Sequence, residues 1–204
     1  MTFLTAAGER AMEERAAAIE AVSAVEVVIA LRARARYSLI QHAIVGIVAA
    51  VATLALTLYS DLPFARWHIL VFPLVAGALG AVLVEAVPPL YRFVEPPWLR
   101  YEHVREAAYA TFIEHRVHAT RHRTGVLVYV AVRERMVEIV GDIAVADQLG
   151  IEDLASMAGT LEAYLPRGAE ALGKALGELA PEFAKRLPRH ADDRDELATS
   201  VHVV

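Results

Sequence analysis

Two long stretches without charged side chains lie close together in this chain, and they limit its folds more than any other feature. No Asp, Glu, Lys or Arg falls between Arg36 and Asp61 or between Arg66 and Glu85. Each stretch, as a helix, is long enough to cross a hydrocarbon core of roughly 30 Å, which takes about 20 residues. The link between them is too short to hold a domain. We therefore predict a transmembrane helical hairpin, with helices at residues 37–60 and 67–87 and an external loop at residues 61–66.

The charges around the hairpin predict its orientation. Arginines flank its two outer ends, whereas the loop carries only Arg66, which Asp61 offsets. Because positively charged residues stay on the cytoplasmic side, both termini and the soluble segments should be cytoplasmic, at the inner membrane of a bacterium. The alternative is a pair of buried helices in a soluble protein. The flanking residues are Arg32, Arg34 and Arg36 before the first stretch, and Arg92, Arg100 and Arg105 after the second.

Composition excludes several classes of function. The net charge is −5 and the arginines are scattered, so no nucleic-acid partner is expected. The chain has no cysteine, which excludes disulfides, iron–sulfur clusters and zinc sites built from thiolates. The nucleophile elbow, the phosphate-binding loop, the dinucleotide fingerprint and the zinc-protease motif are also absent. No motif therefore assigns a catalytic residue, and whether the chain is an enzyme stays open, with a non-enzymatic role favoured.

Helix and strand patterns occur on both sides of the hairpin. A helix is predicted at residues 6–22 and a β-branched strand at residues 25–31, directly before the hairpin. A single strand would leave its backbone groups unpaired, so it should join later strands in one sheet. Those later elements are a helix, two strands and two helices, at residues 99–120, 126–132, 136–140, 151–164 and 168–187, the last interrupted at Pro181.

The predicted fold is an α/β domain with a small mixed sheet flanked by helices and interrupted by the transmembrane hairpin. Its first part is residues 1–36, its second part is residues 96–188, and residues 189–204 form an acidic tail. The continuous apolar run at residues 126–132 predicts a central strand that is covered on both faces. The alternating residues 136–140 predict a half-buried strand paired antiparallel to it.

The sequence around these strands resembles the TPM-domain family, and within it the bacterial members with two membrane spans inside the domain. The likeness rests on Arg123-Thr124-Gly125 before a hydrophobic strand, on Glu-Arg-Met-Val-Glu at residues 134–138 and on Gly141-Asp142. The family includes a thylakoid phosphatase, a photosystem II repair protein and a nematode acetylcholine-receptor modulator. The resemblance implies a TPM-like α/β domain. The chain departs from the family pattern at residues 22–26 and 141–145, both at strand ends.

Three acidic residues are candidates for a divalent-metal site. Glu26, Glu138 and Asp142 would converge at one edge of the sheet if the strands pair as predicted, and the resemblance implies Ca²⁺ as the ion. The alternative is structural, with Glu138 as the outward residue of an alternating strand and Asp142 as a turn or cap residue. No acidic loop of calcium-binding spacing surrounds them, which favours the alternative.

A basic segment before the second strand is a candidate anion site. Arg121, Arg123 and Thr124 would hold a phosphate or an acidic peptide, or would form a basic helix end that complements the helix dipole. Three histidines precede them on one predicted helical face, as either metal ligands or a solvated, pH-sensitive surface. These are His115, His118 and His122.

These observations favour a membrane-anchored accessory or interaction module for other membrane proteins, with a homo-oligomer left open. The first alternative is a divalent-cation-dependent acid phosphatase that uses Glu138 and Asp142, with Arg123 holding the phosphate. The second is a calcium-binding module without catalysis. The absence of assembled catalytic motifs and the altered strand ends favour the interaction module.

Overall fold

The computed structural model describes residues 3–33, 39–86, 96–189, 196–197 and 200–203. Contacts divide the chain into two compact units. One combines Met1–Arg36 with Tyr101–Val204 and is called the α/β domain below, and the other is Tyr37–Arg100 and contains the hairpin. Three of the arginines that predict the orientation, Arg34, Arg36 and Arg92, lie outside the described residues.

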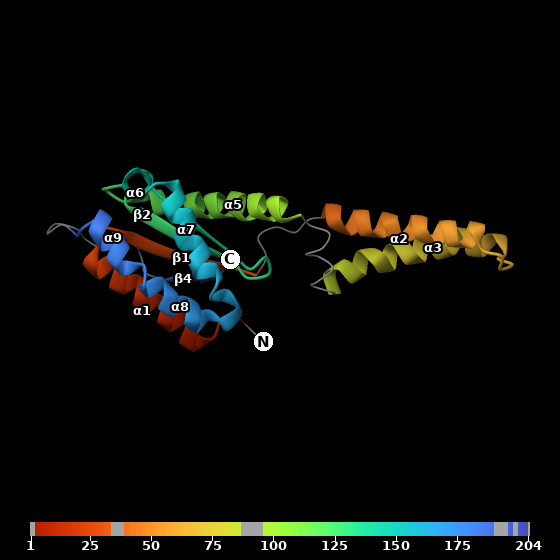
Figure 1. Ribbon diagram of the computed structural model, residues 1–204, viewed down its shortest axis with the longest axis horizontal. Coiled ribbons are helices and arrows are strands. Elements are labelled where there is room, and N and C mark those ends of the chain that lie inside the picture. Colours follow the sequence, from red (N-terminus) through yellow and green to blue (C-terminus); the bar gives the residue numbers. More distant parts are fainter. Residues whose placement is uncertain (1–2, 34–38, 87–95, 190–195, 198–199, 204) are drawn as a thin grey trace. The chain divides into compact units, whose positions relative to one another are not determined.

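A four-stranded mixed sheet forms the centre of the α/β domain (Figure 1). Its strands are β1 (Glu26–Arg32), β2 (Gly125–Ala131), β3 (Met136–Gly141) and β4 (Val201–Val203), in the order β3-β2-β1-β4. β1 runs parallel to β2 and β4, and β3 runs antiparallel to β2. The three predicted strands are confirmed, as is the joining of the strand before the hairpin to the later pair. β2 is buried along its whole length, as predicted for a central strand.

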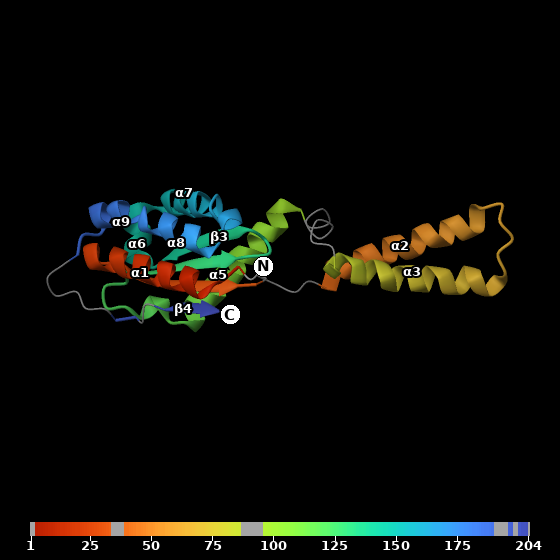
Figure 2. The ribbon, with the colours of Figure 1, turned by 90° about the horizontal axis from the view of Figure 1, so that it is seen from below.

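One face of the sheet is covered by most of the helices (Figure 2). These are α1 (Ala6–Val22), α6 (Ile143–Leu149), α7 (Ile151–Glu162), α8 (Ala169–Gly177) and α9 (Ala180–Arg186). Thr5 begins α1, because its Oγ1 accepts the Gly8 N–H at 3.0 Å and satisfies a backbone donor of the first turn. The apolar stripe of α1 then packs in one core with alternate residues of β1: Met12, Ala16, Ile19, Val27 and Ile29.

The opposite face of the sheet is covered by α5 (Pro97–Glu114) and the short 3-10 helix η1 (Val117–Ala119). Val104, Ala108 and Phe112 of α5 form a second core with the other side chains of β1 and β2. At Gly125 a Cβ would lie 2.0 Å from the Val117 carbonyl oxygen. Only glycine at this position lets η1 approach the start of β2, which gives the Arg-Thr-Gly pattern a structural reason.

Several elements differ from the predicted ones. Helix α6 was not predicted, and the predicted helix at 99–120 ends at Glu114. By contrast, the interruption predicted at Pro181 is confirmed: this segment forms two helices, α8 and α9, and Pro181 lies in the first turn of α9, where a missing N–H breaks no helical bond. A second 3-10 helix, η2 (Leu165–Arg167), precedes α8, and the predicted tail contains β4.

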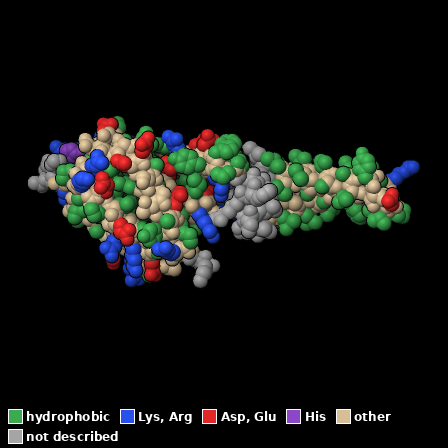
Figure 3. All heavy atoms as spheres, in the orientation of Figure 1, with side chains coloured by type: hydrophobic (Ala, Val, Ile, Leu, Met, Phe, Trp, Pro, Cys, Tyr) green, Lys and Arg blue, Asp and Glu red, His purple; other side chains and the backbone are tan. Residues whose placement is uncertain are grey.

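The second unit contains the helical hairpin of α2 (Leu39–Tyr59) and α3 (Arg66–Ala86). The two helices approach closely through small residues, since a Cβ on Gly46 would lie 2.9 Å from the Gly77 carbonyl oxygen and one on Gly80 would lie 2.9 Å from the Ala49 Cβ. Hydrophobic side chains cover their visible surface (Figure 3), and 11% of each apolar span is buried. Both helices are long and apolar enough to cross a membrane.

Candidate functional site

The starts of β1 and β2 and the end of β3 meet at one end of the sheet. Glu26 pairs with Gly125, and the Asp142 N–H donates to the Gly125 carbonyl at 2.8 Å. Two of the three predicted metal ligands, Glu26 and Asp142, therefore lie on either side of Gly125. Their residues are 8% and 5% exposed, so both are withdrawn from water.

The Asp142 carboxylate makes two interactions with its own domain. Its Oδ1 accepts the Ile143 N–H at 2.8 Å and caps α6, and its Oδ2 lies 3.3 Å from Arg123 Nε. An aspartate is favoured before a helix because it satisfies a free backbone N–H and faces the positive end of the helix dipole. The side chain of Arg123 is 46% exposed, so the ion pair meets solvent on its basic side. Asp142 is thus a cap residue, as the structural alternative predicts.

Arg123 and Thr124 belong to a tight turn that leads into β2. Arg123 has a φ of +58°, and its Nη1 donates to the His118 carbonyl at 2.7 Å. Thr124 is buried, and its N–H donates to Thr120 Oγ1 at 3.0 Å. The turn therefore presents the guanidinium of Arg123 to Asp142 and to solvent, and it holds Thr124 against the domain.

Glu26 and Arg121 interact with the segment that leads to β4. Glu26 Oε2 accepts the N–H groups of Glu196 and Leu197, each at 3.2 Å. A carboxylate oxygen of Glu196 in turn accepts the Arg121 N–H at 2.7 Å. These two predicted site residues, one acidic and one basic, therefore hold the protein's own backbone and side chains in place.

A cavity of about 410 Å³ opens beside this end of the sheet. Thr124 lines it together with His122, Asp147, Gln148 and Arg186. Arg186 is already paired with Glu182 of its own helix, with 3.2 Å between Arg186 Nε and Glu182 Oε1. Because acidic and basic side chains both border the cavity, it presents no concentrated positive charge to a phosphate.

Glu138 lies away from this end of the sheet. It is opposite Tyr129, three residue pairs before the last pair of β3, which is roughly 10 Å along the strand. Burial raises the pKa of the Glu138 carboxyl, Glu162 adds to the rise, and Arg105 opposes it. The structure therefore does not bring Glu138 together with Glu26 and Asp142.

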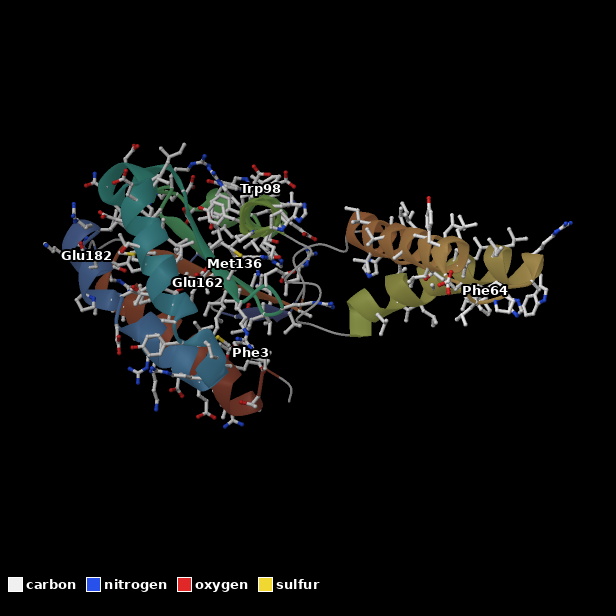
Figure 4. The ribbon with its side chains drawn as sticks, turned by 45° about the vertical axis from the view of Figure 1, so that its right-hand side comes forward. Phe3, Phe64, Trp98, Met136, Glu162 and Glu182 are labelled. Atoms are coloured by element: carbon white, nitrogen blue, oxygen red, sulfur yellow. The ribbon has the colours of Figure 1, made fainter. Side chains whose placement is uncertain are left out.

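Glu162 of α7 accepts a backbone N–H of the edge strand β3. The sequence did not indicate this role. Its Oε1 accepts the Val137 N–H at 3.0 Å, and Figure 4 shows it close to Met136, the first residue of β3. Burial raises its pKa, while the bond from Val137 lowers it. Nothing in the helical pattern distinguishes Glu162 from a solvated glutamate, because its partner is a backbone group distant in sequence.

The histidines do not form a cluster. The His115 ring lies over the His202 ring with centroids 4.3 Å apart, whereas the His118 ring lies 6.2 Å from that of Phe112. His122 lines the cavity described above. Within the described ranges, no group of three or more His, Asp or Glu side chains is placed to hold a metal ion.

A larger cavity, about 770 Å³, lies at the opposite end of the sheet, beyond the end of β2. Thr5, Val132, Arg135, Arg167 and Gly168 are among the residues that line it. Arg135 and Gly168 have positive φ values, +56° and +94°. Arg135 lies between β2 and β3, and Gly168 directly precedes α8, so two turns that are distant in the sequence border one cavity.

Comparison with known proteins supports the fold. No protein-family model and no curated protein matches the sequence. The chain is similar in structure to the BA42 protein of the psychrophilic bacterium Bizionia argentinensis, solved by NMR, with a TM-score of 0.60 and 17% sequence identity over 99% of this chain and 96% of that one. At this identity the likeness is one of fold.

Proposed function

We propose that this chain is a membrane-anchored, TPM-like α/β module that binds other membrane proteins as an accessory component. The proposal rests on the place of the apolar hairpin, because α2 and α3 follow β1 and precede α5, so both ends of the hairpin join one domain. A membrane hairpin returns the chain to the side from which it entered. The arginines around it favour the cytoplasmic side of a bacterial inner membrane.

The hydrogen bonds and ion pair of the buried carboxylates favour a binding function over a catalytic one. Glu26 accepts two backbone N–H groups, and Asp142 caps α6 and pairs with Arg123. A catalytic metal needs several oxygen ligands directed at one point. At this end of the sheet, Glu26 Oε2 and Asp142 Oδ1 accept the domain's own N–H groups, and Asp142 Oδ2 pairs with Arg123.

Single cysteines test the membrane anchor, because the chain has none of its own. Ser60→Cys places a thiol in the hairpin loop, and Arg10→Cys places one on an exposed position of α1. In intact cells with a permeable outer membrane, an impermeant maleimide should label Ser60→Cys, and it should label Arg10→Cys only after the inner membrane is opened. Equal labelling of both variants, or release of the protein by alkaline carbonate, would refute the anchor.

Crosslinking in native membranes tests the binding role. Full-length protein carrying an affinity tag should retain the same membrane proteins in repeated experiments, identified by mass spectrometry. The matched control carries Gly125→Val, which should disrupt the α/β domain at η1 while leaving the hairpin sequence intact. Proteins retained equally by both forms are not partners of the domain. If no protein is retained by the full-length form alone, that result would count against the proposed function.

A phosphomonoesterase is the second candidate, as the family resemblance implies. The observation in its favour is that a cavity of about 410 Å³, lined by Thr124, lies beside the sheet end where Arg123 pairs with Asp142, although its lining carries charges of both signs. Hydrolysis of a generic phosphomonoester by detergent-purified protein, with and without Ca²⁺ or Mg²⁺, tests this candidate. Metal-dependent turnover that Asp142→Asn abolishes would establish an enzyme, whereas equal rates in both proteins would exclude this site as its source.

A further inference from the structure

Helix α5 carries half of the exposed large hydrophobic side chains that the structure describes outside the hairpin. Among the described residues outside α2, α3 and their loop, eight such side chains are exposed, and four of them belong to α5. These four are Trp98, Tyr101, Tyr109 and Ile113. Single exposed hydrophobic residues are normal on a protein surface, whereas a group of them on one element indicates a contact surface.

The four side chains lie along one stripe of the helix. Trp98 is in the first turn of α5 (Figure 4), and Ile113 is in the last. With Arg105 between the two tyrosines, successive members are three or four residues apart, which places them on one helical face. The helix packs on the sheet through a different set of residues, so this stripe lies at the surface of the domain.

The residue types of the stripe are those of a membrane–water interface. Trp and Tyr rings combine an apolar body with a polar group, and they are enriched where acyl chains meet headgroups. Trp98 and Ile113 are 64% and 61% exposed, so the domain itself covers little of either side chain. Arg105 lies over the Tyr109 ring, with 5.7 Å between its Cζ and the ring centroid. An arginine can lay its apolar stem along lipid while its guanidinium reaches the headgroups.

The stripe carries no excess of positive charge. Glu138 of β3 lies near it, because the charge of Glu138 is the main cause of the raised pKa of Tyr101. Glu102 and Glu106 of α5 are exposed as well, against the single positive charge of Arg105. Anionic lipids attract surfaces that are rich in Lys and Arg, and this surface is not one of them. Burial of the rings, and not headgroup charge, must therefore supply any affinity for lipid.

The chain itself keeps the start of this stripe within reach of lipid. Residues 87–96, ten residues, separate the end of α3 at Ala86 from the start of α5 at Pro97. An extended chain spans at most about 3.6 Å per residue, so α5 begins within roughly 40 Å of the end of α3. Under the proposed anchor, the end of α3 lies at the membrane surface. A surface tethered by so short a link meets the bilayer at an effective concentration near the millimolar range, so a weak affinity is enough.

We propose that this stripe of α5 contacts the lipid bilayer at the boundary between headgroups and acyl chains. The contact depends on the interfacial region of the bilayer and not on the charge of its headgroups. It gives the chain a second membrane contact, outside the hairpin, that ties α5 to the membrane surface. This inference rests on the proposed membrane anchor and adds a lipid-binding surface to it. The stripe consists of Trp98, Tyr101, Arg105, Tyr109 and Ile113.

The two tryptophans of the chain test the proposal directly, because Trp67 belongs to the hairpin and Trp98 to the stripe. Trp67→Phe leaves Trp98 as the only tryptophan, and Trp98→Phe leaves Trp67. Each full-length variant is reconstituted into phosphatidylcholine vesicles with or without lipid that is brominated in the upper part of its acyl chains. We expect the brominated lipid to quench about half or more of the emission of each tryptophan. Circular dichroism checks that both variants are folded.

The two variants separate this inference from the proposed anchor. Quenching of Trp67 without quenching of Trp98 would overturn the lipid contact of α5 and leave the anchor in place. Quenching of Trp98 without quenching of Trp67 would refute the hairpin as an anchor, while the stripe would stand as a lipid-binding surface.

Single cysteines test which face of α5 meets lipid, since the chain has no cysteine of its own. Tyr109→Cys places a thiol in the stripe, and Ala110→Cys, the matched control, places one at the next residue, which is also exposed but lies about 100° further round the helix. Each thiol carries the same fluorescent label, in vesicles with or without spin-labelled phosphatidylcholine. The label at Tyr109→Cys should be quenched at least about twofold more strongly than the label at Ala110→Cys. Equal quenching at the two positions would overturn the stripe as the contact face.

Two variations of the vesicle experiment separate lipid from other occupants. Addition of anionic phosphatidylglycerol should leave the quenching of Trp98 unchanged, and quenching that appears only with the anionic lipid would overturn a contact made by ring burial. Dilution of the protein in lipid should also leave the quenching unchanged. Quenching that appears only on dilution would show that a second copy covers the stripe at higher density, which overturns lipid as its occupant.

Discussion

Replacement of Asp142 tests whether its carboxylate is structural. The residue caps α6 through a 2.8 Å bond to the Ile143 N–H and pairs with Arg123 at 3.3 Å. Loss of a helix cap costs about 1 kcal/mol of unfolding free energy, within a range of roughly 0.5–2. The ion pair contributes up to about 1 kcal/mol, since the side chain of Arg123 is half exposed and solvent screens it. Asp142→Ala should therefore cost about 1.5–2 kcal/mol.

Asp142→Asn separates the two contributions. Asparagine caps helices about as well as aspartate, so this change removes the ion pair and keeps the cap. Asp142→Asn should lower the unfolding free energy by about 0.5 kcal/mol, clearly less than Asp142→Ala does. Asp147→Asn is the matched control, since Asp147 is an exposed residue of the same helix, and a surface change of this kind stays within about 0.5 kcal/mol.

Urea unfolding of the full-length protein in detergent, followed by circular dichroism, measures these differences. An unchanged dependence of the unfolding free energy on urea would show that the variants differ in stability alone. Combining Asp142→Asn with Arg123→Gln should lower the unfolding free energy by less than the sum of the two single changes, because both remove the same ion pair, although Arg123→Gln also removes the bond to the His118 carbonyl. Equal costs for Asp142→Ala and Asp142→Asn would refute the cap, and costs no larger than that of Asp147→Asn would refute a structural role altogether.

Three further predictions follow from individual contacts. Burial raises the pKa of the Glu138 carboxyl above its ordinary 4.5, so the folded state binds the proton more tightly than the unfolded state does. The unfolding free energy therefore falls as the pH rises through that range. Glu138→Gln should remove this loss, so that urea titrations show a higher unfolding free energy at pH 7 and a nearly unchanged one at pH 4. Gly125→Ala should lower the unfolding free energy by more than about 2 kcal/mol, because its Cβ would meet the Val117 carbonyl. Gly159→Ala, which has open space around its Cβ inside α7, should raise the unfolding free energy by about 0.5–1 kcal/mol in the same assay. Millimolar Ca²⁺ should leave the melting temperature unchanged, since Glu26, Glu138 and Asp142 do not converge; a rise that Asp142→Asn abolishes would restore the metal site.

The sequence predicted the elements whose pattern is long and periodic. The apolar run of β2 and the alternation of β3 each specify a strand on their own, and α1 carries a cap and a regular apolar stripe. Helix α6 is only seven residues long and β4 only three, so both are shorter than the stretch over which a periodic pattern can be recognised. β4 exists because β1 offers it an edge, and no local pattern in an acidic tail reports an edge that lies about 170 residues earlier.

The predicted metal site failed at Glu138 for a reason that strand geometry alone supplies. Glu138 and Asp142 are four residues apart around the end of a strand, and an extended chain advances about 3.3 Å per residue. Their backbones are therefore separated by roughly 13 Å, too far for both carboxylates to bind one ion without a sharp turn between them. The prediction that Glu26 and Asp142 lie at one end of the sheet is confirmed. It rested on the position of each residue at the end of a strand.

Four carboxylates of this domain share one role, which explains why some of them resembled a site. Glu20, Glu26, Asp142 and Glu162 each accept a backbone N–H at a place where regular pairing stops: at a strand edge, at a helix start or beside the C-terminal segment. A backbone N–H left unpaired in the interior is costly, so acidic residues are favoured at strand ends with or without a ligand. Acidic residues at strand ends therefore point to chemistry only when their oxygens face a cavity. Here they face the chain itself, so the search for function moves to the surfaces that bind other chains.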